Sequence, residues 1–230
     1  MGKSGRGAKT FAVIVFTLFS IPAFADMRVN LKYNFPERYG TTCGGEFLMT
    51  VLDDPVGVYS KNDQFTTFCL ETNEYIDQNH NYYVTIGSAA MNGGTGGGSP
   101  DLLSPEAAYL YSLWLDGTDG VNTIVHGTAT TDALQRALWY LEGENLGSNS
   151  GLSGTYISWA QDAVSPGGAN DSWCDKWGYT IGDIRVMNMW WNPEHTSYAQ
   201  DQFVRVPLPA AVLLGLLGLS AAGLKLRKSI

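Results

Sequence analysis

The segment Gln64-Phe65-Thr66-Thr67-Phe68-Cys69-Leu70-Glu71 carries the clearest indication of the fold. Its β-branched and aromatic residues favour an extended chain, and successive side chains of a strand point to opposite faces. We therefore expect a strand here, with Cys69 and Glu71 on the same face. Similar β-rich runs predict further strands, which cover 47–52, 82–86, 184–190 and 202–206.

The middle of the chain is expected to be helical. Ser104, Pro105 and Glu106 suit a cap, a first helical position and the positive end of the helix dipole. Apolar residues then recur at helical spacing in 107–115 and 130–141, with a weaker helical pattern in 156–164. The sequence therefore predicts an α+β domain over residues 26–203, a β-sandwich or barrel with a few helices inserted between its strands.

Residues 1–25 are typical of a secretory signal peptide. Basic residues occur among the first nine, an apolar run covers 11–21, and Ala23-Phe24-Ala25 fits a small-residue cleavage site. We therefore expect an exported protein whose mature chain begins at Asp26.

The last segment, residues 204–230, combines two prolines, an apolar run and a basic end. Pro207 and Pro209 precede an uncharged stretch, and three cations follow that stretch at 225, 227 and 228. Counted from Val206 to Leu226, the run has about 21 residues, enough for a helix that spans a bilayer. Cations after the helix favour a cytoplasmic end. We expect a transmembrane helix that anchors the exported domain in the inner membrane.

This tail resembles the PEP-CTERM sorting signal of Gram-negative bacteria. The motif is carried by Val206, Pro207, Leu208 and Pro209, with Leu208 where the family usually has Glu. The resemblance implies processing by an exosortase-type enzyme and a final place in the cell envelope, at the surface or in the extracellular matrix. A plain C-terminal anchor and a buried core helix are the alternative interpretations.

The charge of the exported part excludes one class of partner. All 22 acidic residues but only 8 of the 14 basic residues lie between Asp26 and Val206, which gives this part a net charge of −14. Such a surface repels nucleic acid, so we expect no nucleic-acid partner. Seven Trp and twelve Tyr supply large side chains for a core and for binding.

Few residues are arranged for catalysis. His80, His126 and His195 are isolated in the sequence and have no metal-ligand spacing, so we expect no metal and no cofactor. Glu142 and Glu144 stand two apart at a helix end, where we expect them to be solvated and not a glycosidase pair. We therefore predict no catalytic residues and no enzyme, and an envelope hydrolase is the least favoured hypothesis.

Two short motifs remain, Phe68-Cys69-Leu70-Glu71 in a predicted strand and Leu134-Gln135-Arg136-Ala137-Leu138-Trp139 in a predicted helix. Their order resembles the thioester-forming domains of bacterial surface adhesins, although Leu134 stands where that family commonly has Thr. The resemblance implies a thioester between Cys69 and Gln135, shielded from water by Phe68 and Trp139. A surface amine or hydroxyl would attack the acyl group and become covalently attached.

Three cysteines in an exported chain cannot all pair with one another. If Cys69 forms the thioester, we expect a disulfide between Cys43 and Cys174. The alternative is that Cys69 is a buried strand cysteine and Gln135 an exposed helix residue. The domain would then be a non-covalent structural or carbohydrate-binding protein of the envelope or exopolysaccharide matrix, with Trp and Tyr side chains as the polysaccharide-binding surface.

Overall fold

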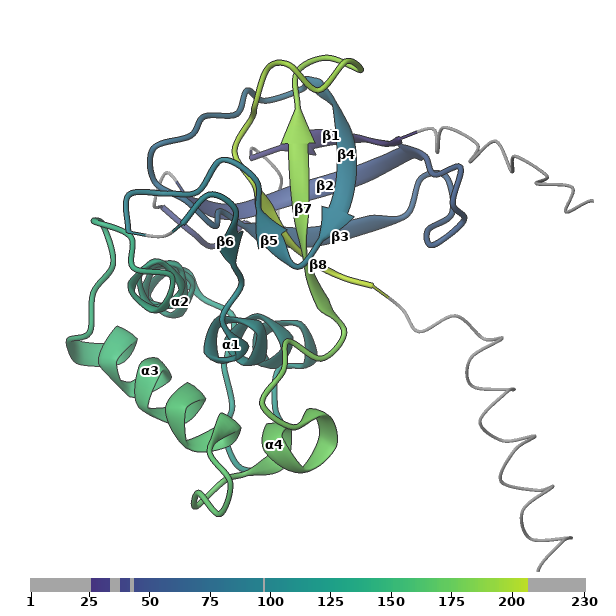
Figure 1. Cartoon of the computed structure of the whole chain (residues 1–230). Coiled ribbons are helices and arrows are strands. Elements are labelled where there is room, and N and C mark those ends of the chain that lie inside the picture. Colours follow the sequence, from purple (N-terminus) through teal and green to yellow (C-terminus); the bar gives the residue numbers. More distant parts are fainter. Residues whose placement is uncertain (1–25, 34–37, 42–43, 97, 207–230) are drawn as a thin grey trace, which may run out of the picture.

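The computed structural model describes residues 26–33, 38–41, 44–96 and 98–206, which form a barrel-like sheet with helices to one side of it (Figure 1). The predicted α+β class is confirmed, and the sheet is a nearly closed barrel. The predicted signal peptide and residues 207–230, with the predicted transmembrane helix, lie outside the described residues. Among the residues that are described, no helix is both long and apolar enough to cross a membrane.

The barrel is a six-stranded antiparallel sheet in the order β3-β2-β1-β4-β7-β8. A bridge between Cys69 and Gln202 brings the edge strands β3 and β8 together and almost closes the sheet. The strands are β1 (Met27–Lys32), β2 (Gly45–Asp53), β3 (Gln64–Phe68), β4 (Asn81–Gly87), β7 (Ile184–Trp190) and β8 (Gln202–Arg205). Sequence patterns predicted all of these except β1, whose inward side chains alternate along the strand at Met27, Val29 and Leu31.

Four helices and a small second sheet fill the segments between β4 and β7. They are β5 (Ala89–Ala90), β6 (Asp101–Leu102), α1 (Pro105–Asp116), α2 (Thr128–Leu141), α3 (Gly151–Val164) and α4 (Ser172–Trp177). The start of α1 is the predicted one, because the Ser104 side chain accepts a hydrogen bond from the Ala107 N–H at 3.1 Å. The helices pack mainly against one another, and α1 and α2 also contact the barrel strands β7 and β2.

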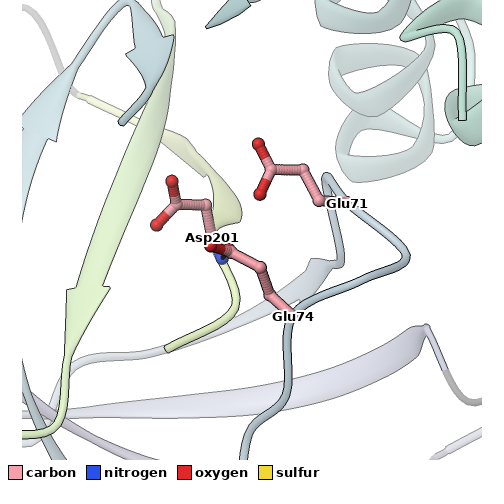
Figure 2. A group of neighbouring side chains, drawn as sticks. All are labelled: Glu71, Glu74 and Asp201. Carbon is pink, nitrogen blue, oxygen red and sulfur yellow. Dashed lines mark hydrogen bonds between the residues drawn. The ribbon is translucent and has the colours of Figure 1, made fainter. Parts of the chain in front are cut away.

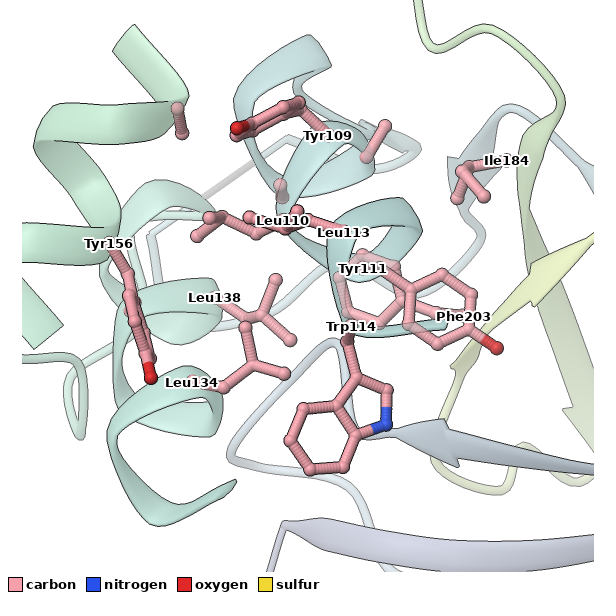
Figure 3. Packing of buried hydrophobic residues seen from close by; sticks show 14 of the residues in the cluster. Tyr109, Leu110, Tyr111, Leu113, Trp114, Leu134, Leu138, Tyr156, Ile184 and Phe203 are labelled. Atoms are coloured by element: carbon pink, nitrogen blue, oxygen red, sulfur yellow. The ribbon is translucent and has the colours of Figure 1, made fainter. Parts of the chain in front are cut away.

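Two hydrophobic cores meet near the end of β3. One lies between the helices and the barrel and includes the fully buried Trp114 (Figure 3). Trp114 also meets Phe68 edge to face, with 5.4 Å between the ring centroids. The other fills the barrel and includes Cys69, Met49 and Trp139. Phe68 and Cys69 are neighbours in the chain but belong to different cores, because adjacent residues of an extended chain point to opposite faces. Cys69 therefore faces the barrel interior.

The last strand also fixes where the domain ends. Val204 pairs with Arg185, and the Arg205 guanidinium contacts the Asp116 carboxylate at 2.7 Å. The boundary expected after residue 203 lies within β8, and Val206, the last residue of this described range, donates its N–H to the Asp183 carbonyl oxygen at 2.9 Å.

Candidate functional site

The two residues expected to form a thioester lie side by side. Gln135 comes from α2, and its Oε1 accepts a hydrogen bond from the Cys69 N–H at 3.2 Å. Its Nε2 donates to the Cys69 carbonyl oxygen at 2.9 Å. Both residues are completely buried. Gln135 thus hydrogen-bonds both backbone polar groups of Cys69, as a neighbouring strand would. The alternative expectation, that Gln135 is an exposed helix residue, is wrong.

Two glycines allow α2 to approach the chain at Cys69 so closely. A Cβ at Gly44 would lie 2.8 Å from Gln135 Cδ and 2.2 Å from the Trp139 ring. At Gly45 a Cβ would lie 3.0 Å from Gln135 Oε1. The Gly44 carbonyl oxygen also accepts a hydrogen bond from the Cys69 N–H at 2.7 Å. The sequence analysis missed this glycine pair, since a Gly-Gly dipeptide ordinarily indicates only a turn.

The sulfur of Cys69 is approached from β8. Gln202 Nε2 lies 3.4 Å from Cys69 Sγ, and Gln202 is itself fully buried. The Cys69 sulfur is therefore enclosed in the barrel core beside the Gln202 amide and away from bulk water.

The two residues expected to shield the thioester lie on either side of the glycine pair. Trp139 is one helical turn after Gln135, and its ring occupies the space that a Cβ at Gly44 would need. Phe68 meets the Cβ position of Gly45 at 2.6 Å, from the core beside the helices. Trp139 is 4% exposed and Phe68 is fully buried, so both help to exclude water from the Gln135 amide.

A cleft of about 450 Å³ opens on the far side of Trp139. Its walls are largely apolar and aromatic and include Tyr33, Phe47, Tyr75 and Trp139, with Arg38 beside them. Tyr75 is strongly exposed at 79%. Trp139 borders both the cleft and the glycine pair, and so connects the cleft wall to the surroundings of Gln135.

The expected disulfide falls partly outside the described residues, because Cys43 is not among them. Cys174 lies on α4, where it is half-buried. The pairing of Cys43 with Cys174 stays a prediction.

The expectation that Glu142 and Glu144 are solvated is wrong. Glu144 is 5% exposed and accepts hydrogen bonds from the backbone N–H groups of Thr72 at 2.9 Å and Thr95 at 2.8 Å. Glu142 Oε1 accepts two hydrogen bonds from Ser104, and burial raises the pKa of its carboxyl to about 7. Segments distant in sequence fold over the end of α2 and bury both carboxylates, which a helical pattern alone does not reveal.

A second acidic group lies beyond the end of β3 (Figure 2). Glu71, Glu74 and Asp201 each offer a carboxylate oxygen, and these atoms lie within 4.8 Å of one another. Burial and the neighbouring acids, Glu74 first, raise the pKa of Glu71 to about 10, and burial raises that of Asp201 well above its ordinary value. The sequence analysis expected Glu71 on the same strand face as Cys69, but β3 ends at Phe68 and Glu71 lies in the loop that follows. The cluster was not predicted, because its members come from separate segments.

Across the described ranges, no histidine joins a group of potential metal ligands. His126 stacks on Trp114 with 3.8 Å between ring centroids, while His80 packs against Tyr82 and His195 against Trp190. These rings belong to aromatic packing.

The chain matches no protein-family model, no curated protein and no solved structure. Its function must therefore be inferred from its own residues and their arrangement.

Proposed function

We propose that this protein is an exported bacterial surface adhesin whose barrel domain forms an internal thioester between Cys69 and Gln135 and attaches covalently to a partner. One observation carries the proposal: the fully buried Gln135 amide is hydrogen-bonded to both backbone polar groups of Cys69. The resemblance of the two surrounding motifs to thioester-forming adhesin domains gives this contact its chemical interpretation.

Formation of the thioester needs no further reactant. The Cys69 sulfur attacks Gln135 Cδ, the bond from Cδ to Nε2 breaks, and the nitrogen leaves as ammonia with the thiol proton. The Gln135 oxygen gains negative charge during the attack. The Cys69 N–H, 3.2 Å from that oxygen, is placed to stabilise the charge as an oxyanion-hole donor does.

Capture of the partner reverses the roles of the same atoms. An amine or hydroxyl attacks the Gln135 acyl carbon, Cys69 leaves as a thiolate that takes up the proton, and an amide or ester to the partner results. Each molecule reacts once, so the protein is not an enzyme. The cleft beside Trp139 supplies a place where a partner is held before its nucleophile reaches Gln135.

The two ends of the chain support export and sorting. Residues 1–25 have the pattern of a signal peptide, and the PEP-CTERM-like motif begins at Val206, where the described chain leaves β8. The proposal therefore includes an exosortase-type processing enzyme as a partner. The C-terminal helix holds the protein in the inner membrane before processing, and the mature domain then resides in the envelope, at the surface or in the matrix.

Intact-mass spectrometry of the purified protein under non-reducing conditions tests the thioester. We expect a mass below that of the processed, fully reduced sequence by one ammonia for the thioester and by two hydrogen atoms for the predicted disulfide between Cys43 and Cys174. The ammonia is the deficit that reports the thioester; methylamine should abolish it and appear on Gln135. The variants Cys69→Ala and Gln135→Ala should each lack the deficit. Circular dichroism should show that both variants retain the wild-type fold.

Two matched variants serve as controls. Cys174→Ala removes a cysteine from α4, and Gln161→Ala removes an exposed glutamine from α3. Both should keep the mass deficit and the reaction with methylamine. A wild-type protein of full sequence mass would refute the thioester. So would a peptide that links Cys69 to Cys43, the chain neighbour of Gly44.

A second function is favoured by the cleft itself. Tyr33, Tyr75 and Trp139 line it, and exposed aromatic side chains bind sugar rings by stacking. If the mass deficit is missing, non-covalent binding of an envelope or matrix polysaccharide is the function that the cleft supports. Reversible polysaccharide binding that is lost in Tyr75→Ala, with no covalent adduct, would distinguish it from the thioester.

A further inference from the structure

Three buried carboxylates converge next to the barrel closure (Figure 2). Glu71 and Glu74 come from the loop that follows Cys69, and Asp201 immediately precedes β8. Their exposed fractions are 2%, 8% and 1%. Removing carboxylates from water is costly unless each gains a compensating partner.

Hydrogen bonds hold two of the three carboxylates in place. Asp201 accepts from the N–H groups of Met189 at 3.0 Å and Met91 at 3.2 Å. Glu74 accepts from Asn92 Nδ2 at 3.0 Å and from the Asp201 N–H at 3.2 Å. Each of these oxygens has a second lone pair, so the donors orient the carboxylates and leave them able to bind a further group.

Glu71 is different, because no N–H or hydroxyl group of the described residues donates to its carboxylate oxygens, and the hydrogen-bonding side chain beside it is another acid, Glu74. Its side chain extends into the space that it shares with Glu74 and Asp201 (Figure 2). The charges that act most strongly on it are those of Glu74, Asp201 and Glu144, all of them acids. Such a group needs either protons or a cation to relieve the repulsion.

We propose that Glu71, Glu74 and Asp201 bind one divalent cation of the Ca²⁺ class. Calcium takes oxygen ligands at about 2.3–2.6 Å. One ion can touch all three carboxylates, because their oxygens lie within 4.8 Å of one another, about twice that bond length. Glu74 also lines the cleft, which gives the ion a route to the site and supplies water for its remaining coordination positions.

The ligand set selects among metals. Every donor in the group is a carboxylate oxygen, and neither histidine nor cysteine belongs to it. Zinc and copper prefer nitrogen and sulfur ligands, whereas calcium and magnesium prefer oxygen. Magnesium usually keeps most of its water and binds one or two carboxylates, so three converging carboxylates favour calcium.

The position of the site suggests what the ion stabilises. Glu71 is two residues after Cys69, and Asp201 precedes Gln202, which bridges to Cys69. A bound ion would join the segment after β3 to the segment before β8 and so stabilise the barrel where it closes. The inference uses only the fold and stands apart from the thioester.

Calcium titration of the full-length purified protein tests the site. After treatment with EDTA and dialysis at pH 7.5, we expect a saturable binding heat with Ca²⁺ at a stoichiometry of one. We also expect a rise in the unfolding temperature of about 5 °C at saturation. Mg²⁺ at the same concentrations should give a smaller rise.

Variants assign the effect to the cluster. Glu71→Gln should weaken calcium binding at least tenfold. Glu74→Gln, which changes the ligand that lines the cleft, should weaken it too and is the second variant should the first fold poorly. Glu142→Gln is the matched control, because it replaces a half-buried glutamate outside the cluster and should keep the wild-type response to calcium.

Two results would overturn the proposal. One is a wild-type protein that shows neither binding heat nor a shift in unfolding temperature with millimolar Ca²⁺. The other is an equal response in Glu71→Gln. If protons alone relieve the repulsion, Glu71→Gln should be more stable than wild type at pH 7.5. In that case calcium should change the unfolding temperature of neither protein. Neither readout involves covalent capture, so this outcome would leave the thioester untouched.

Discussion

Gly44→Ala is expected to separate Gln135 from Cys69 without removing either residue. The new methyl would lie 2.2 Å from the Trp139 ring and 2.8 Å from Gln135 Cδ, whereas carbon atoms pack at about 3.5–4.0 Å. The ring must therefore retreat by more than about 1 Å and Gln135 by about 0.7 Å. Overpacking of this kind costs about 1–3 kcal/mol of unfolding free energy.

The larger consequence is chemical. Displacing a reacting group by about 1 Å slows a reaction roughly 10²-fold, so Gly44→Ala should form the thioester slowly or incompletely. Urea unfolding measures the stability, and intact mass measured against time after purification measures the missing ammonia.

Gly127→Ala is the matched control, because Gly127 precedes α2 with an extended φ of 178° and its Cβ would have 3.6 Å of space. The unfolding free energy of this control should fall by at most about 1 kcal/mol, and the control should keep the missing ammonia in its mass. If Gly44→Ala retains both wild-type stability and the full deficit, the close approach at Gly44 is not what positions Gln135.

Two further predictions concern Glu142 and Trp139. Burial raises the pKa of Glu142 to about 7 in the folded state, above its unfolded value of about 4.3, so the folded protein binds more protons between these values. Stability should therefore fall as pH rises from about 4.5 to 7, by on the order of 3 kcal/mol. In Glu142→Gln, urea unfolding should show a loss from pH 5 to 7.5 that is smaller by about this amount, because Glu71 and Asp201, whose pKa values are also raised, still contribute. A loss equal to that of wild type would contradict the assignment. Trp139→Ala should admit water, which hydrolyses the thioester and leaves a carboxyl group at position 135. Peptide mapping should find this carboxyl in most molecules. A stable thioester in this variant would show that Trp139 is not the shield.

Local patterns predicted the elements whose formation depends on local chemistry. Ser104 and Pro105 specify the start of α1 whatever the helix packs against. The β-rich run from Gln64 specifies β3. The strand β1 escaped prediction although Val29 and Leu31 alternate inward, because its six residues include one β-branched side chain and no aromatic one. The barrel also required the pairing of β3 with β8, which follows from contacts between distant segments.

The contact between the two residues of the proposed thioester was predicted, and its surroundings were missed. Cys69 and Gln135 were identified through motifs, and the structure places them in contact. The close approach of α2 at Gly44 was not predictable from sequence. The absence of a side chain at Gly44 has a role only because α2 packs against it, and that packing is known only from the structure. Buried acids such as Glu71 were missed for a related reason: carboxylates ordinarily indicate solvent, and only the closed barrel buries them.

The closure of the barrel at Cys69 has a mechanical consequence. Gln202, at the start of β8, bridges to Cys69, and the chain leaves the domain after Arg205 at the other end of the same strand. In the proposed adhesin, capture breaks the bond to Cys69, so the partner would pull on α2 through Gln135 while the C-terminal tail pulls on the Arg205 end of β8. All four residues of β8 pair with β7, and its other end bridges to Cys69, so the strand is secured at both ends against that pull. The residues that close the barrel would in this way also hold the domain together under load.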